Sequence, residues 1–459
     1  MITRRPFALA LALTSLLLAS PAAPARAQMC DTLAEVISTL KAPTYGFPTV
    51  WDADYGQRGR MVQFAGGVLM PEGTIMAYGL KLDEQTSQPL ETGLVELNRR
   101  GRTLVEQFVP AKAGEQPVGL IRLGDRLIGV STIRAGKNKD RHVRVSWYDR
   151  QGVYKREQIF SDPAYDYTAQ AIVTAAEGKG FVVVIHAVSR KDSTDQYGIL
   201  SRHGADGAQI WKRAYRPGVN NMLAGLAATD DKSYVATGKI IMDDGRMAGW
   251  ILKLAHDGTI LWQRTYPRGK YSVLNAGGAS AKVTADGSPY LLVTGAAEPV
   301  DGKPHAVWVM EVNPLGEPLW QRYYRLRDYE FVGQDVSSRP DGRVVVVANA
   351  RAADSYDPAL QDHIRVLSLS PRGVMIDDQS YLNGLKAESH AVTRNASGET
   401  VVTSTILKQQ KTSEEEYGPA VPVPEGTQVP PEKSLQEGWV MVVPGLDSYE
   451  DPCMRKPRR

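Results

Sequence analysis

The sequence predicts an all-β protein, a seven-bladed β-propeller with four antiparallel strands in each blade. Two observations predict this fold. A strand–turn–strand unit recurs about every 50 residues along the chain, a period typical of propeller blades. In addition, the strand that the last unit lacks has a counterpart near the N-terminus, at Trp51–Tyr55.

The repeated unit is recognised by a turn glycine that is followed four residues later by a Trp-x-x-x-Tyr strand. The clearest copies follow Gly207, Gly258 and Gly316. Each copy is a hairpin with a tight turn, and a second hairpin, such as the one around Gly342, lies upstream of it. The unit therefore contains four strands, which we name a to d in chain order. Six complete units span residues 61–109, 115–160, 168–215, 221–266, 275–324 and 330–382.

A seventh unit starts at Lys386 and reaches its strand c at Gly438–Val443, but no Trp-x-x-x-Tyr strand follows. Trp51–Tyr55 has the Trp-x-x-x-Tyr spacing that the seventh unit lacks. We therefore expect this N-terminal strand to complete the last blade, which would leave no open sheet edge at the closure of the ring. The propeller as a whole is predicted to span residues 51–453.

The first 27 residues have the order of a secretory signal peptide. Arg4 and Arg5 precede an uncharged apolar run from Phe7 to Ala19, and a small-x-small cleavage pattern ends at Ala27. The apolar run is shorter than the roughly 20 residues that a membrane-spanning helix needs. We therefore expect cleavage, with an uncleaved anchor as the alternative, and a periplasmic or secreted protein without a transmembrane segment.

Residues 28–50 form a lead-in to the first blade. Leu33, Val36, Ile37 and Leu40 have helical spacing, so a short amphipathic helix is expected over residues 31–40. At the other end, residues 454–459 form a basic tail, which is expected to be a solvated end.

Two cysteines, Cys30 and Cys453, lie at opposite ends of the expected mature chain. In an exported protein such a pair favours a disulfide bond, which would tie the termini together at the closure of the ring. Two unpaired thiols are the alternative.

Charge argues against a nucleic-acid partner. The chain has 54 Lys and Arg against 51 Asp and Glu, and the signal peptide holds three of the arginines and no acid, which leaves 51 of each after cleavage. A net charge near zero provides no field that would steer the protein toward nucleic acid or anionic lipid.

The Gly-x-x-x-Trp hairpins at Gly207, Gly258 and Gly316 resemble the quinoprotein-type (PQQ-like) repeat and the looser Asp-Gly…Trp repeats of secreted bacterial propellers. The likeness covers residues 165–325 best. It implies a propeller, tryptophans packed between neighbouring blades and an extracytoplasmic location. Many such propellers are scaffolds or assembly factors, and a minority are dehydrogenases. Those enzymes need a quinone and calcium site near the axis, and they often have an adjacent cysteine pair. The two cysteines of this chain are not adjacent. No cofactor is therefore predicted.

The b–c connections are mostly longer and more charged than the tight a–b and c–d turns. In a propeller the b–c and d–a connections share one face, here called the loop face, which is predicted to carry recognition. The alternative is that these connections are variable surface loops with no role in recognition. His142, His305 and His363 lie at the b–c junctions of units 2, 5 and 6. Three imidazoles on one face could bind a metal, whereas solvated loop histidines are the simpler interpretation.

A second candidate site lies on the innermost strands. Counting eight residues back from the a–b turn glycine places Gln170, Ala279, Gln334 and His390 at one equivalent position. Together with Asp335 they are expected beside the central channel, where a small polar ligand or ordered water could bind.

The sequence contains no Gly-x-Ser-x-Gly elbow, no His-Glu-x-x-His motif and no phosphate-binding glycine-rich loop, so no catalytic residue is assigned. We expect a non-catalytic binding or scaffold module for a protein or cell-envelope partner, acting through the loop face. The alternative is a propeller enzyme, of glycosidase or lyase type or a quinone-dependent dehydrogenase, with its site at the channel mouth.

Overall fold

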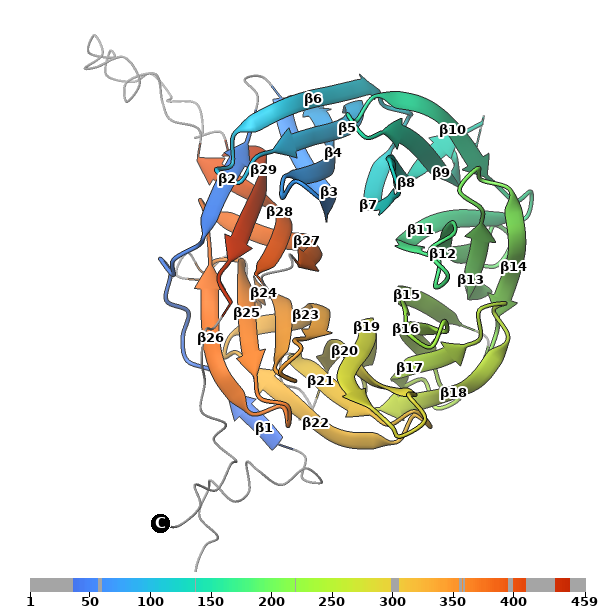
Figure 1. Cartoon of the computed structure of the whole chain (residues 1–459), viewed down its shortest axis with the longest axis vertical. Coiled ribbons are helices and arrows are strands. Elements are labelled where there is room, and N and C mark those ends of the chain that lie inside the picture. The colour runs from blue at the N-terminus through green and yellow to red at the C-terminus, as the bar shows by residue number, and fades with distance from the viewer. Residues whose placement is uncertain are drawn as a thin grey trace, which may run out of the picture.

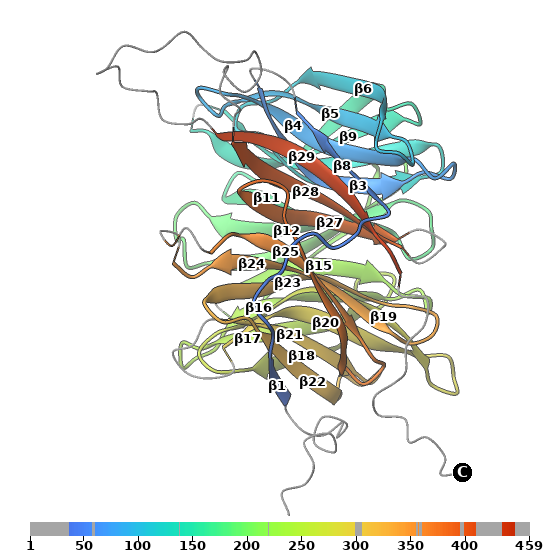
Figure 2. The same ribbon diagram turned by 90° about the vertical axis from the view of Figure 1, so that its left-hand side faces the viewer.

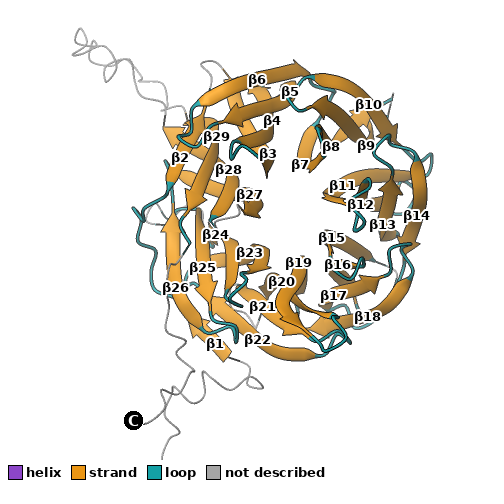
Figure 3. Ribbon diagram, in the orientation of Figure 1, coloured by secondary structure: helices purple, strands orange, loops and turns teal. Residues whose placement is uncertain are grey.

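The computed structural model describes residues 36–56, 60–136, 138–218, 220–298, 305–354, 357, 360–394, 399–409 and 434–445. Their strands form seven four-stranded units in a ring, which confirms the seven-bladed propeller (Figures 1 and 3). No helix that could span a membrane occurs within these ranges. The expected signal peptide, both cysteines and the basic tail lie outside them.

Blades 1 to 6 follow one another along the chain, each with strand a innermost and strand d outermost (Figure 1). The predicted units match these blades to within a few residues. Blade 1 comprises β3 (Arg60–Leu69), β4 (Ile75–Asp83), β5 (Pro89–Leu97) and β6 (Thr103–Pro110); blade 2 comprises β7 (Gln116–Leu123), β8 (Arg126–Ala135), β9 (Asp140–Asp149) and β10 (Tyr154–Phe160). Blade 3 comprises β11 (Tyr165–Thr174), β12 (Phe181–Ser189), β13 (Gln196–His203) and β14 (Gln209–Tyr215); blade 4 comprises β15 (Asn221–Ala228), β16 (Tyr234–Ile241), β17 (Met247–Leu254) and β18 (Ile260–Pro267). Blade 5 comprises β19 (Ser272–Val283), β20 (Pro289–Ala297), β21 (Ala306–Val312) and β22 (Pro318–Arg325); blade 6 comprises β23 (Tyr329–Ser338), β24 (Val344–Ala352), β25 (His363–Leu369) and β26 (Met375–Tyr381).

Blade 7 joins the two ends of the chain. It contains β27 (Lys386–Arg394), β28 (Thr400–Gln409) and β29 (Ser434–Val443), and β2 (Trp51–Tyr55) is its outer strand. β2 runs antiparallel to β29, with Trp51 opposite Val442 and Tyr55 opposite Gly438. The predicted closure is therefore confirmed. The Tyr55 ring also stacks on Phe64 of blade 1, with 5.7 Å between ring centroids, so the closing strand packs into the next blade as well.

The helix predicted for residues 31–40 is wrong where the structure describes this segment. Val36–Thr39 forms strand β1, which pairs in parallel with β22, the outer strand of blade 5. An outer strand presents unpaired backbone N–H and C=O groups. Residues 36–39 pair with these groups as a strand, although the spacing of their apolar side chains predicts a helix. Val36 and Ser38 are partly covered, while Ile37 and Thr39 are exposed, which is the alternation of a strand.

From β1 the chain runs along the outside of blade 6 to reach β2 in blade 7 (Figures 1 and 2). The Arg365 guanidinium donates to the carbonyl oxygen of Lys41, and Phe47 packs near Tyr381 with 6.3 Å between ring centroids. The N-terminal segment therefore connects blades 5, 6 and 7 from the outside.

The repeated tryptophan and tyrosine of strand d hold the turn of the following blade. Between blades 4 and 5, the Tyr266 hydroxyl donates to the carbonyl oxygen of Gly316 at 2.6 Å, and the Trp262 indole donates to that of Pro314 at 2.7 Å. A Cβ atom on Gly316 would lie 2.8 Å from the Trp262 ring, so the turn needs glycine. The tyrosine-to-glycine bond recurs at Tyr215–Gly258 and Tyr324–Gly373. The spacing that marks the repeat is therefore the spacing of an inter-blade contact.

Replacing Tyr266 by phenylalanine is expected to lower the free energy of unfolding by about 1 kcal/mol, because the buried Gly316 carbonyl loses its donor. Urea denaturation measures the change. Tyr290→Phe is the matched control, since its hydroxyl makes no hydrogen bond with the part of the chain that the structure describes. Equal stability of the two variants would contradict the role given to the Tyr266 hydroxyl.

Candidate functional site

The innermost strand of every blade carries a β-bulge at one equivalent position. The pairing of strand a with strand b skips one residue there in all seven blades. The skipped residues are Ala65, Val118, Gln170, Ala224, Asn275, Gln334 and His390. The equivalence predicted for Gln170, Gln334 and His390 is therefore correct. The assignment of Ala279 is wrong, because β19 has a second irregularity between Ala279 and Val283, and counting back from its turn stops short of Asn275.

These bulge residues lie on the innermost strands of the ring, and two of them form local hydrogen bonds. Nε2 of His390 lies 3.0 Å from the Thr405 hydroxyl, and the surrounding protein lowers the pKa of the imidazole by desolvation. The Asn275 amide donates to the Gly333 carbonyl at 3.0 Å and so joins blades 5 and 6. Asp335 follows the bulge of β23 and is partly buried. The hydrogen bonds of His390 and Asn275 therefore involve different blades and do not converge on one point.

The three loop-face histidines lie in three different blades. His142 lies in β9, His305 immediately before β21, and His363 at the start of β25. Nδ1 of His305 lies 2.5 Å from a Glu330 carboxylate oxygen, and its ring stacks on Tyr271. Within the described ranges, no group of three or more His, Cys, Asp or Glu side chains could hold a metal ion.

His363 is a core residue, so its interpretation as a solvated loop histidine is wrong. It has no solvent exposure, and its Nδ1 lies 2.8 Å from the Gln361 carbonyl oxygen. The rings of Tyr45 and Tyr329 pack edge-on against it at 5.5 and 5.1 Å. Burial lowers the pKa of His363 to about 4; the Gln361 carbonyl opposes the shift and Arg365 adds to it.

The buried His363 is expected to make the protein acid-sensitive. Its pKa is lower in the folded chain than the value of about 6.5 in the unfolded chain, so its stabilising effect is complete above pH 6.5 and is lost as the pH falls toward 4. At pH 5 the loss is about 2 kcal/mol.

Urea denaturation at pH 7 and pH 5 measures this loss, and His363→Gln is expected to reduce the difference by that amount. The pKa of His186 and that of His203 are lowered as well, so the variant is expected to keep part of the pH dependence. The change in unfolding free energy between pH 7 and pH 5 is therefore compared between the variant and the parent. His256→Gln, at an exposed position, serves as the control. An unchanged pH dependence in His363→Gln would contradict the assignment.

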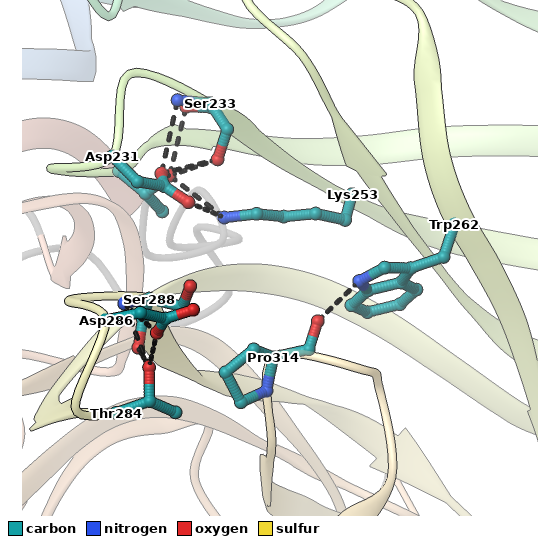
Figure 4. A network of polar contacts seen from close by, with 9 residues as sticks. Asp231, Ser233, Lys253, Trp262, Thr284, Asp286, Ser288 and Pro314 are labelled. Carbon is teal, nitrogen blue, oxygen red and sulfur yellow. Dashed lines mark hydrogen bonds and ion pairs between the residues drawn. The ribbon is translucent and has the colours of Figure 1, made fainter.

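Carboxylates on the opposite face, where the a–b and c–d turns lie, stabilise their own turns (Figure 4). In the a–b turn of blade 4, Asp231 accepts hydrogen bonds from the Thr229 and Ser233 hydroxyls and pairs with Lys253 at 3.0 Å. Burial opposes ionisation of Asp231, but these partners outweigh it and lower its pKa to about 2. Thr284, Asp286 and Ser288 repeat the arrangement in blade 5. These acids are structural.

A pocket of about 1010 Å³ lies on the loop face, between blades 1 and 2 and beside blade 7. It is formed by the inner strands β3 and β4, the loops around residues 87–89 and 113–116, the end of β8 and the start of β29. The lining residues are Met61, Gln63, Leu80, Leu82, Ser87, Gln88, Pro89, Ala113, Gly114, Glu115, Gln116, Arg134, Ala135, Gly136, Lys139 and Gln436. Its volume is at the upper end of the range for ligand sites.

Glu115 is the acidic residue of this lining, and it is fully occupied. Its side chain is buried, and its two carboxylate oxygens accept from the Arg144 guanidinium at 2.7 and 2.8 Å. The Ser131 hydroxyl and the backbone N–H of Lys112 each donate to it at 2.8 Å. Four hydrogen bonds from three donor groups therefore fix the carboxylate beside Arg144, a geometry that suits a structural role better than proton transfer.

Arg134 and Lys139 supply the positive charge of the pocket. Neither forms an ion pair or a side-chain hydrogen bond with another described residue. The aliphatic part of Arg134 covers Gly114, where a Cβ atom would lie 2.9 Å from its Cδ. The sequence pointed to the loop face but not to the residues that line this pocket, because the lining as a whole comes from blades 1, 2 and 7 and shares no motif.

No protein-family model matches the chain, and no curated protein sequence matches it. Among solved structures, it is similar to a subtype N11 neuraminidase-like protein of A/flat-faced bat/Peru, with a TM-score of 0.45 and 9% identity over 91% of this chain and 98% of that one. It is also similar to the Pan2 WD40 domain of Neurospora crassa, with a TM-score of 0.41 and 10% identity over 85% and 98%. The alpha-L-arabinanase of Penicillium chrysogenum gives a TM-score of 0.43 and 8% identity over 70% and 96%. The likeness concerns the propeller fold and does not extend to activity.

Proposed function

We propose that this chain is an exported, non-catalytic binding module that engages a protein or cell-envelope partner through its loop face. The pocket between blades 1 and 2 carries the proposal. It combines a ligand-sized volume, two exposed cations, four exposed or partly exposed glutamine amides, and a carboxylate that forms an ion pair. A pocket of this kind suits recognition, whereas general acid–base chemistry needs a group that is free to exchange a proton. The signal-like order of the first 27 residues supports the export part of the proposal.

Photo-crosslinking in the native host tests the proposal. A photoreactive residue placed at Gln88, an exposed position of the pocket lining, is expected to give a discrete higher-mass adduct on irradiation. The matched control is the same residue at Arg100, which is exposed on the opposite face in the c–d turn of blade 1. Adducts from both positions alike, or from neither, would count against a partner at the loop face.

A further inference from the structure

The positive charge of the pocket favours a negatively charged ligand. Arg134 and Lys139 line it without an ion pair to any described residue, and the charge of Glu115 is balanced by Arg144. The described lining therefore carries two uncompensated positive charges. Cations that line a concave site attract an anionic ligand and oppose a cationic one.

Four glutamine side chains in the lining offer hydrogen bonds of both kinds. They are Gln63, Gln88, Gln116 and Gln436. The Gln63 amide donates to the Gln436 carbonyl oxygen at 3.1 Å, which fixes one pair across blades 1 and 7 and leaves both amides with further donors and acceptors. A side-chain amide matches the N–H and C=O groups of an extended peptide backbone, because each places N–H donors next to a C=O acceptor.

The apolar part of the lining is aliphatic. Met61, which is partly exposed, supplies most of this surface, and the largely buried Leu80 and Leu82 lie beneath it on β4 of blade 1. No aromatic side chain is among the described lining residues, so the pocket lacks the flat surface on which a sugar ring usually stacks. Aliphatic side chains, and methionine above all, adapt to apolar side chains of varied shape. The lining therefore favours a peptide over a polysaccharide.

We infer that the pocket binds an extended, acidic peptide segment of the partner, with carboxylates at Arg134 and Lys139, backbone groups at the glutamines and an apolar side chain at Met61, Leu80 and Leu82. The inference rests on the proposed function and gives it a ligand class. Binding through two cations also makes the affinity dependent on salt, because dissolved ions screen exposed charges.

Fluorescence anisotropy tests the inference with the whole chain and two labelled hexapeptides that alternate glutamate with leucine or glutamine with leucine. The glutamate peptide is expected to bind, more weakly as the salt rises from about 0.05 M to about 0.5 M, and the glutamine peptide at least about tenfold more weakly. The paired change Arg134→Gln and Lys139→Gln is expected to weaken binding of the glutamate peptide by a similar factor.

The matched control is Arg100→Gln with Arg102→Gln, which removes the same charge from exposed positions on the opposite face and leaves binding unchanged. Thermal unfolding confirms that both pairs of substitutions keep the fold. Equal binding of the two peptides, or full binding by the Arg134 and Lys139 variant, would overturn the inference. So would tighter binding of an oligouronate than of the glutamate peptide, which would assign the pocket to an anionic sugar.

The two proposals can fail separately. If the adduct from the Gln88 position persists when Arg134 and Lys139 are replaced, the loop face binds a partner but not through an acidic peptide. If the glutamate peptide binds as expected and no adduct forms at Gln88, the pocket has the inferred chemistry and the proposed role in the host is wrong.

Discussion

A chain that begins at Gln57, and so lacks β1 and β2, is expected to lose more than about 5 kcal/mol of unfolding free energy, comparable with the whole stability of a typical domain. β2 is the outer strand of blade 7, and its removal exposes the edge of β29. Trp51 and Tyr55 of β2 pack against the core between blades 7 and 1, which contains Val440 and Val442. Removing two aromatic side chains from such a core costs about 3–5 kcal/mol each when they are fully buried, and less here because both are partly exposed.

Urea denaturation and hydrogen exchange measure this effect, and the amides of β29 are expected to lose protection first. A chain that begins at Thr49 is the matched control, because it lacks β1 and the segment along blade 6 but keeps β2. In the full chain, Trp51→Ala with Tyr55→Ala isolates the side-chain part of the loss. Cooperative unfolding of the chain from Gln57 at the parent's urea midpoint would show that the ring closes without β2.

The blades were predictable because each carries its own markers. The turn glycine and the Trp-x-x-x-Tyr strand recur since they form one inter-blade contact, as Gly316, Trp262 and Tyr266 show. Closure by Trp51–Tyr55 was predictable for the same reason, because the strand kept the spacing of its equivalents. Such local signals survive because every repeat packs against a neighbour of the same shape.

The errors arose where tertiary contacts override a local pattern. Residues 36–39 follow a helical spacing, but the free edge of β22 pairs with them as a strand. His363 follows a charged connection in the sequence, yet Tyr45 from the N-terminal segment and Tyr329 cover its ring. In both cases the contacting residues are distant in the sequence: β22 from residues 36–39, and Tyr45 and Tyr329 from His363. A local sequence pattern therefore cannot reveal these contacts.

The face on which the candidate site lies was predictable from the sequence, but the residues that line the site were not. The longer b–c connections indicated the loop face, and the pocket lies there. Its lining combines residues as far apart as Met61 and Gln436, which become neighbours only because blade 7 closes onto blade 1. Asn275 was missed for a related reason: the position of the bulge, rather than the distance from the turn, defines equivalence between blades.

Replacing Glu115 by glutamine is expected to lower the free energy of unfolding by about 3–5 kcal/mol, because Arg144 would stay charged and buried without its strongest partner. The Arg144 side chain is only 2% exposed, and its remaining anionic partner is Glu157, which accepts from Nε at 2.8 Å. In the parent, burial by itself would lower the pKa of Arg144, but the neighbouring charges, that of Glu115 first, outweigh it and raise that pKa. In the variant the guanidinium still keeps its charge, because an arginine side chain does not lose its proton in proteins.

Urea denaturation of Glu115→Gln measures the loss, and Glu157→Gln is the matched control at the more exposed end of the same arginine, where a cost of about 1 kcal/mol is expected. The double change Glu115→Leu with Arg144→Met removes both charges and is expected to recover part of the stability, although Ser131 and the Lys112 N–H then lose their acceptor. A loss below about 1 kcal/mol in Glu115→Gln would mean that the carboxylate is not needed for the fold and is free for chemistry. The enzyme alternative would then gain its first candidate acid, whereas the full loss assigns Glu115 to the wall of a binding pocket.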